Sequence, residues 1–210
     1  LAAFTAPDVC FGTPMLFSNN STAAGGSVAG YHWNFPNGTP SVSTLANPTI
    51  VFGASGSLNA TLIVTNNFGC ADTIQQAVNV LPNPVASFSA PSVCFGAPFQ
   101  ITNTSTVSPA GSAMTYTWSI PGALPNSSTA QQPVVSFSNP GSSVITLVTT
   151  SPGGCSDTAQ STVTIYPLPD AGFSAPAVCF GTATPFTNSS SVTSGGSLSA
   201  FSWSFPGATP

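Results

Sequence analysis

Five cysteines are the residues of this 210-residue chain best suited to form a specific bond. Four of them fall into two sets with nearly equal spacing: Cys70 follows Cys10 by 60 positions, and Cys155 follows Cys94 by 61. This spacing suits the disulfides Cys10–Cys70 and Cys94–Cys155, each worth roughly 4 kcal/mol in the chain-entropy model. Zinc binding is the alternative, although no second Cys or His lies near either member of a set. Two disulfides predict an oxidising, extracellular location.

The other groups that could do chemistry are few: four Asp and one His, with no Glu, Lys or Arg. Without Lys or Arg the chain cannot neutralise phosphates, which argues against nucleic-acid binding and against attachment to an anionic membrane surface. His32 is the single histidine of the sequence, and we interpret it as an ordinary surface histidine. The sequence contains no nucleophile–base–acid set and no phosphate loop. We expect neither an enzyme nor a bound cofactor or metal.

Apolar residues are nevertheless abundant enough for a folded core. The chain has 15 Phe and 3 Trp, and 41% of its residues are hydrophobic, which is unlike a disordered chain. No apolar run reaches the roughly 18 residues that a membrane helix needs, so we expect no membrane insertion. No signal peptide is visible at Leu1, which suggests an internal piece of a longer protein.

A long internal repeat organises the chain. The phrase Phe-Ser/Thr-Ala-Pro-x-Val-Cys-Phe-Gly begins at Phe4, Phe88 and Phe173. Trp33, Trp118 and Trp203 follow at intervals of 85, and Pro-x-Pro segments at 82–84 and 167–169 mark the joints. We predict domains at residues 1–84 and 85–169, and the first half of a third at 170–210. Cys179 is the first cysteine of that third unit; we expect its partner beyond residue 210, in the missing half of the same unit, with an intermolecular bond as the alternative.

Each unit shows the pattern of short strands. Aromatic residues alternate with polar ones around each tryptophan, as in Tyr31, Trp33 and Phe35, which places the tryptophans in the core. About seven such strands per unit, separated by Gly, Pro, Asn and Ser, predict an all-β chain of tandem immunoglobulin-like sandwiches. Trp33, Trp118 and Trp203 are the predicted core aromatics.

The strand and turn at Tyr31-His32-Trp33-Asn34-Phe35-Pro36-Asn37-Gly38 resemble the hallmark of PKD (polycystic kidney disease) repeats. The later run from Gly56 to Thr65 is similar to the family's second characteristic strand. Both hallmark aspartates of the turn are replaced, by Asn34 and Asn37, so the calcium site that some members build there is not expected. The likeness is strongest to cysteine-containing PKD arrays of giant surface proteins in Bacteroidetes-like bacteria. It implies an elongated array, export by the type IX pathway and a role as stalk, adhesin or spacer.

A repeated aspartate follows the second cysteine of each complete unit. Asp72 and Asp157 each precede a threonine, and the simplest interpretation is a side chain that caps a turn. Asp-Thr followed by an aliphatic residue also resembles the O-glycosylation sequence of exported proteins in that bacterial group. The resemblance therefore implies Thr73 and Thr158 as possible glycosylation sites.

The outward positions carry Ser, Thr, Asn and Gln in place of ions, and the net charge is only -4. Such surfaces can pack together without desolvating charges. We therefore predict a cell-surface filament or adhesin stalk whose partners are copies of itself, and also surface glycans or another cell. The alternative is a carbohydrate-binding or spacer module of a secreted hydrolase. Its repeated candidates for exposed contacts are Phe11, Phe95 and Phe180.

Overall fold

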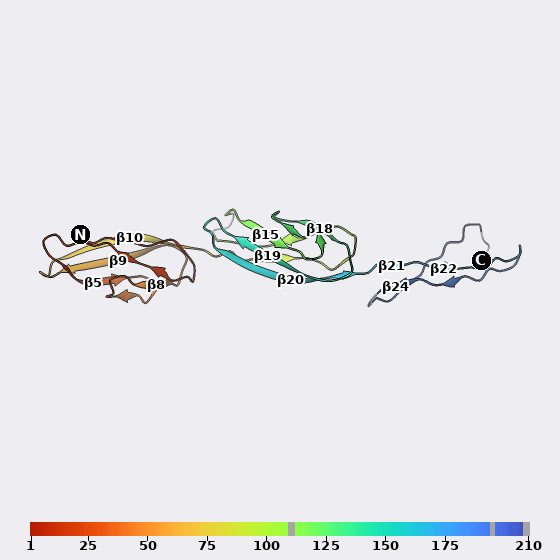
Figure 1. Cartoon of the computed structure of the whole chain (residues 1–210), viewed down its shortest axis with the longest axis horizontal. Helices are drawn as coiled ribbons and strands as arrows, with labels where there is room; N and C mark the ends of the chain where they lie inside the picture. Colours follow the sequence, from red (N-terminus) through yellow and green to blue (C-terminus); the bar gives the residue numbers. More distant parts are fainter. Residues whose placement is uncertain (109–111, 194–195, 208–210) are drawn as a thin grey trace. The chain divides into compact units, whose positions relative to one another are not determined.

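The computed structural model describes residues 1–108, 112–193 and 196–207, and these residues form strands and loops with no helix (Figure 1). The predicted all-β class is therefore confirmed. Among the described residues there is accordingly no helix long and apolar enough to cross a membrane.

The first repeat is a sandwich of two sheets. The larger sheet has the order β2-β10-β9-β5-β7, with strands β2 (Val9–Cys10), β10 (Ala71–Leu81), β9 (Gly56–Asn66), β5 (Val28–Asn34) and β7 (Val42–Ser43). The smaller sheet has the order β3-β8-β6, with strands β3 (Met15–Leu16), β8 (Thr49–Phe52) and β6 (Gly38–Thr39). A short pair joins β1 (Phe4–Thr5) to β4 (Ser18–Asn19). Strand β2 runs parallel to β10, whereas β9 and β10 form a long antiparallel hairpin.

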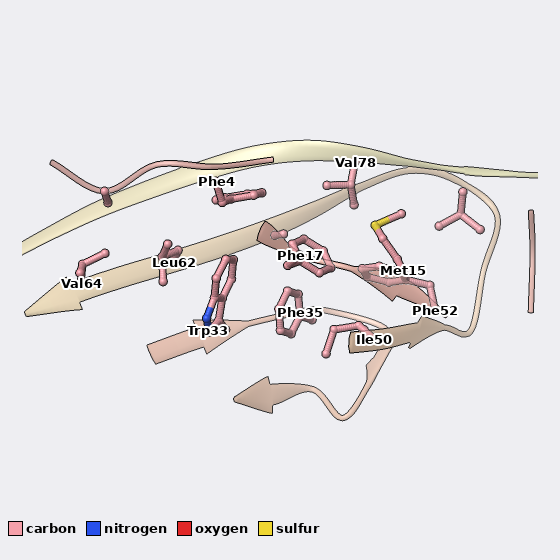
Figure 2. Packing of buried hydrophobic residues seen from close by; sticks show 13 residues of the cluster. Phe4, Met15, Phe17, Trp33, Phe35, Ile50, Phe52, Leu62, Val64 and Val78 are labelled. Atoms are coloured by element: carbon pink, nitrogen blue, oxygen red, sulfur yellow. The ribbon is translucent and has the colours of Figure 1, made fainter. Parts of the chain in front are cut away.

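The core of the first repeat lies between these sheets and follows the period of two in the sequence. Trp33 is fully buried on β5, while His32 and Asn34 on either side of it are exposed. Aromatic rings dominate the centre (Figure 2), where the ring of Phe17 lies 4.7 Å from that of Phe35 and 5.5 Å from that of Trp33. Tilted and edge-on ring pairs of this kind contribute about 1 kcal/mol each beyond their buried area.

The second repeat has the same plan. Its larger sheet has the order β12-β20-β19-β15-β17, with strands β12 (Val93–Cys94), β20 (Ser156–Tyr166), β19 (Gly141–Thr150), β15 (Thr115–Ser119) and β17 (Ser127–Ser128). Its smaller sheet has the order β13-β18-β16, with strands β13 (Phe99–Gln100), β18 (Val134–Phe137) and β16 (Ala123–Leu124). The short pair is β11 (Phe88–Ser89) with β14 (Thr102–Asn103). The 85-residue period is thus a period of folded structure.

Equivalent core residues make equivalent bonds in the two repeats. The indole Nε1 of Trp33 donates to the carbonyl of Leu45 at 2.9 Å, and that of Trp118 donates to the carbonyl of Ala130 at 2.9 Å. Each acceptor lies 12 residues downstream of its tryptophan. These bonds allow a polar indole N–H to be buried without loss of hydrogen bonding.

The turn that differs most from the PKD hallmark keeps its backbone conformation. Asn37 has φ 65° in the first repeat, and Gly122 has φ 80° at the equivalent position of the second. Asn and Gly are the residues that tolerate this left-handed region most readily. The change from Asn-Gly to Gly-Ala therefore preserves the turn, because in both repeats the first residue of the pair takes the left-handed conformation.

From residue 169 onward, the described residues form only short strand pairs. These are β21 (Pro169–Asp170) with β24 (Ser191–Val192), and β22 (Phe173–Ser174) with β23 (Thr187–Asn188). The second of these pairs corresponds to β1 with β4 and to β11 with β14 in the earlier repeats. Pro169, which we placed last in the second domain, already pairs with Val192 of the third.

By compactness the chain divides into two units. One contains residues 1–86, 105–115 and 148–158, and the other contains 87–104, 116–147 and 159–210. The strand pairings follow the repeats more closely, since each five-stranded sheet lies within 1–84 or within 85–169. The domain limits of 1–84, 85–169 and 170–210 therefore stay a prediction from the sequence repeat.

Candidate functional site

The two cysteines of a repeat lie at opposite ends of its longest strand. Cys10 pairs in register with Leu81, the last residue of β10, whereas Cys70 immediately precedes Ala71, the first. Ten steps along a strand span roughly 33 Å. A disulfide requires Cα atoms within about 7 Å of each other. The fold therefore does not permit a Cys10–Cys70 bond.

The same argument applies to the second repeat. Cys94 pairs in register with Tyr166, at the end of β20, and Cys155 precedes Ser156, at its beginning. The expected Cys94–Cys155 bond would also have to span the whole strand. Both pairings predicted from spacing thus differ from the structure, because equal spacing in the sequence carries no information about which end of a strand a residue occupies.

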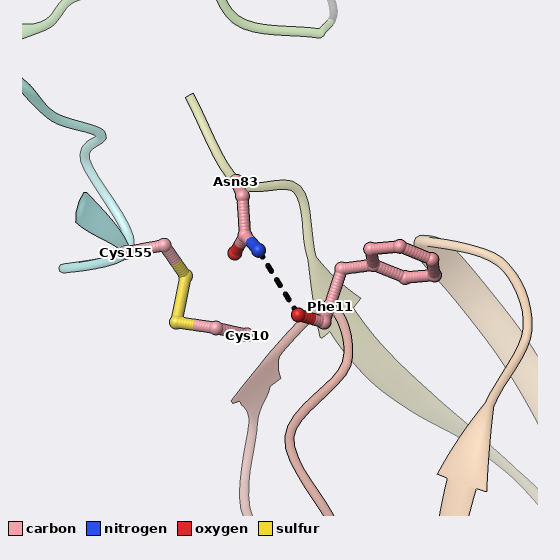
Figure 3. The surroundings of a disulfide bond; sticks show 4 residues. All are labelled: Cys10, Phe11, Asn83 and Cys155. Carbon is pink, nitrogen blue, oxygen red and sulfur yellow. Dashed lines mark hydrogen bonds between the residues drawn. A yellow bond between two sulfur atoms is a disulfide. The ribbon is translucent and has the colours of Figure 1, made fainter. Parts of the chain in front are cut away.

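The structure instead joins Cys10 to Cys155, 145 residues away, with Cα atoms 5.7 Å apart (Figure 3). This disulfide links the first cysteine of repeat one to the second cysteine of repeat two, and both residues belong to the first compact unit. Cys155 is only 2% exposed. Beside the bond, Asn83 Nδ2 donates to the carbonyl of Phe11 at 3.0 Å, which fixes the joint segment against the turn after Cys10 (Figure 3).

Three cysteines have free thiols, and all three are exposed: Cys70, Cys94 and Cys179. The expectation that Cys179 pairs beyond residue 210 stays a prediction. The described residues contain no group of three or more His, Cys, Asp or Glu side chains placed to hold a metal ion.

The repeated aspartates hold the beginning of each repeat. Asp72 Oδ2 accepts a hydrogen bond from the backbone N–H of Ala2 at 2.6 Å, and Asp157 Oδ2 accepts one from Ala86 at 2.8 Å. The partners lie about 70 residues away, so the role differs from the local turn cap that we expected. Hydrogen bonds from the N–H groups of Ala2 and Thr73 lower the pKa of the Asp72 carboxyl, because they stabilise its ionised form.

The two predicted glycosylation sites are accessible. Thr73 on β10 and Thr158 on β20 are exposed. Whether they carry sugars stays a prediction. His32 is exposed on β5, on the outward side of the strand that buries Trp33, as the alternation indicated.

The predicted core tryptophans have different environments. Trp33 and Trp118 are 0% and 1% exposed, whereas Trp203 is 41% exposed. In the third unit, Trp203 packs on Phe173 at 5.4 Å, much as Trp33 packs on Phe4 at 5.2 Å. Among the described residues of this unit, however, no long strands equivalent to β9 and β10 cover the rings. A groove of about 740 Å³ lies over them instead.

The aromatic residues considered for sugar contacts do not form a uniform set. Phe11 is 43% exposed and Phe180 is fully exposed, but Phe95 is partly buried against the core of the second repeat. A repeated ligand platform would need the same exposure at each copy. These positions therefore give little support to a repeated sugar site.

Comparison with known proteins agrees with the hallmark strand and turn. Residues 2–80 match the family model of the PKD domain. The pre-pro-metalloprotease PrtV of Vibrio cholerae serotype O1 is 34% identical over 111 residues, which are 52% of this chain and 12% of that protein. The matched part of the chain thus spans about an eighth of the length of these curated relatives.

Two solved structures are also similar to this chain. The crystal structure of the PKD1 domain from the Vibrio cholerae metalloprotease PrtV is 33% identical, covers 38% of this chain and 93% of that domain, and has a TM-score of 0.34. A C-terminal 282-residue fragment of intimin, solved with the intimin-binding domain of its translocated receptor, has a TM-score of 0.53. At 12% identity, over 81% of this chain and 66% of that one, it shows the tandem sandwich fold alone. The family match shows that residues 2–80 belong to the PKD domain family, and the motifs of this first repeat recur in the second sandwich.

Proposed function

We propose that the chain is a structural segment of an extracellular filament or adhesin stalk, assembled from several copies lying side by side. The observation that carries this proposal is the bond between Cys10 and Cys155, which ties one repeat covalently to the next. A disulfide between successive domains resists separation under tension and adds nothing to catalysis. PKD domains are themselves non-catalytic modules, and the matched relative is a pre-pro-metalloprotease that carries a PKD domain. Export by the type IX pathway of Bacteroidetes-like bacteria is part of the same proposal.

The surface of the long strands supports lateral association. Exposed amides and hydroxyls bond to each other across neighbouring strands: Gln75 Nε2 donates to Thr61 Oγ1 at 3.4 Å, and Gln160 Nε2 donates to Thr146 Oγ1 at 3.1 Å. The chain contains no Lys or Arg and only four Asp. Two such faces can meet without the cost of several kcal/mol that burying each unpaired ion would carry.

A spacer or carbohydrate-binding module of a secreted hydrolase is the second candidate. The observation in its favour is the 34% identity to a segment of a Vibrio metalloprotease precursor. In that role the chain would work as a monomer, and its task would be to hold a catalytic domain at a distance or to bind a polysaccharide.

Electron microscopy and light scattering of the purified 210-residue chain distinguish the two candidates. The stalk proposal predicts particles much heavier than the 20.9 kDa monomer, and multistranded fibres with an axial repeat of roughly 40 Å, one domain length. Copies should not be retained on cellulose or chitin.

A chain that stays monomeric at all concentrations, and that binds to either polysaccharide, would overturn the filament and establish the binding module. A monomer that binds neither would leave the spacer as the function.

A further inference from the structure

We propose that the cysteines of this chain follow one pairing rule: the first cysteine of each repeat bonds to the second cysteine of the following repeat. The bond Cys10–Cys155 is one instance of the rule. Cys94 is then the attachment site for the Gly-Cys-x-Asp-Thr turn of the third repeat, and Cys179 is the attachment site for the same turn of a fourth repeat. Cys70 is the matching site for a repeat placed before the first. This inference does not depend on the filament.

The first cysteines of all three units have the same backbone setting. Each is followed by a turn in which the amide three residues later donates to the cysteine carbonyl: Thr13 to Cys10 at 2.9 Å, Ala97 to Cys94 at 3.4 Å and Thr182 to Cys179 at 3.0 Å. In each turn the glycine two residues after the cysteine, at 12, 96 and 181, has φ between 79° and 84°. The residue after the cysteine also bonds to the end of the long strand, Phe11 to Leu81 at 2.8 Å and Phe95 to Tyr166 at 3.0 Å.

The second cysteines also share a setting. Asn66 donates its N–H to the carbonyl of Cys70 at 2.9 Å, and Ser151 donates to that of Cys155 at 2.8 Å. The glycine before each cysteine has φ 82° or 83°. The hairpin turn therefore presents Cys70 in the way that it presents Cys155, which is bonded.

The positions of the cysteines at opposite ends of the long strand allow bonds between repeats but not within a repeat. Within a repeat the two cysteines are separated by the roughly 33 Å length of β10 or β20. The rule assigns Cys70, Cys94 and Cys179 to partners outside residues 1–210. These three are the exposed, free thiols, whereas Cys155, whose partner is present, is buried. One rule thus accounts for all five cysteines.

Formation of the bond is an ordinary thiol–disulfide exchange with a disulfide oxidant, for which oxidised glutathione serves in the test. The Cys94 thiolate attacks one sulfur of oxidised glutathione and releases a glutathione thiolate. The thiolate of the partner cysteine then attacks the Cys94 sulfur and releases the second glutathione. The two cysteines lose two electrons and two protons, and oxidised glutathione is reduced to two glutathione molecules.

The first experiment maps the disulfides of the 210-residue chain after equilibration in a glutathione redox buffer at low protein concentration. Free thiols are alkylated, and the chain is digested with pepsin, because it has no site for trypsin. Mass spectrometry should find the peptide of Cys10 joined to that of Cys155, and Cys70, Cys94 and Cys179 alkylated. A Cys10–Cys70 or Cys94–Cys155 peptide would overturn the rule.

The second experiment supplies the missing partner. The chain is extended after Pro210 by a copy of its own residues 126–169, which completes the third repeat because Pro210 corresponds to Pro125 in the 85-residue period. The rule predicts that the added copy of Cys155 bonds to Cys94 and that Cys179 stays a thiol. A bond between the added cysteine and Cys179 would overturn the rule.

Two variants of the extended chain serve as matched controls. Cys179→Ser should leave the new bond intact, whereas Cys94→Ser should leave the added cysteine fully alkylated. The Cys10–Cys155 peptide in the same digest reports that the chain has folded. If that peptide is present and neither variant changes the alkylation of the added cysteine, the rule is wrong.

Discussion

At the scale of single residues, the two repeats differ at one buried position in a way that affects stability. Thr149 on β19 is 0% exposed, and its Oγ1 has no hydrogen-bond partner among the described residues. The equivalent residue of the first repeat is Val64, which is buried in the core without this cost. A buried hydroxyl that lacks a partner loses its hydrogen bonds to water and gains none in return.

Thr149→Val is therefore expected to stabilise the second repeat by about 1 to 2 kcal/mol, because it removes the unpaired hydroxyl and keeps the shape of the side chain. The measurement is the free energy of unfolding from urea titration, followed by tryptophan fluorescence. The matched variant Val64→Thr should destabilise the first repeat by a similar amount. Equal stability of the wild-type chain and Thr149→Val would show that the hydroxyl finds a partner in solution.

The cysteines show the limit of reasoning from residue spacing. Near-equal separations of 60 and 61 positions suggested two equivalent bonds within repeats. The cysteines of the two repeats do occupy equivalent positions. The two cysteines of one repeat do not bond to each other, however, because they lie at opposite ends of β10 or β20. The sequence alone identifies which residues are equivalent, but only the strand register places them in space.

At the scale of elements, the long strands β10 and β20 determine how each repeat begins. Their first residues include Asp72 and Asp157, which accept hydrogen bonds from the first strand segment of the repeat. The last residues of β10 and β20 pair with the segment that carries the first cysteine of the same repeat. Alternation within a strand could not predict the partners of the aspartates, because these lie about 70 residues away in the sequence.

The first repeat is expected to lose stability in acid through Asp72. The pKa of this carboxyl is lower in the folded chain than its ordinary value of 3.8. A carboxyl of this kind stabilises the fold above its unfolded pKa, and the contribution is lost as the pH falls through the lower, folded pKa. Urea unfolding at pH 7 and below about pH 4 should therefore show a smaller pH dependence for Asp72→Asn than for the wild-type chain.

Asp8→Asn is the matched control for this prediction, because Asp8 is exposed in the loop between β1 and β2. It should keep the wild-type difference between the two pH values. If Asp72→Asn and Asp8→Asn behave alike, the hydrogen bond from Ala2 does not contribute to the acid sensitivity.

At the scale of the whole molecule, the scarcity of charge is the dominant property. The net charge is -4 over 210 residues, and only 2% of residues are charged. Two copies therefore have little charge that would keep them apart, and few ions that must lose water when surfaces meet. Because Coulomb forces contribute so little, the ionic strength should have little influence on their association.

Light scattering between low salt and about 0.5 M salt, over which the Debye length falls severalfold, tests this expectation. The wild-type chain should show the same association at all salt concentrations. A double variant, Gln75→Lys with Gln160→Lys, places one cation at the same exposed position of each complete repeat. Its association should be weaker at low salt and recover as salt screens the new charges. Dissociation of wild-type assemblies by modest salt would contradict the proposal.

By itself the sequence determined the repeat, the all-β sandwich, the burial of Trp33 and Trp118, and the likeness of the first repeat to a PKD domain. These properties follow from local patterns: alternation over a few residues, turn residues between strands, and identical phrases 84 or 85 positions apart. Only the tertiary structure decided which cysteines meet and what the repeated aspartates hold. The physical reason is that both depend on which residues lie at the same end of a strand of roughly 33 Å, a distance that spacing along the chain does not encode.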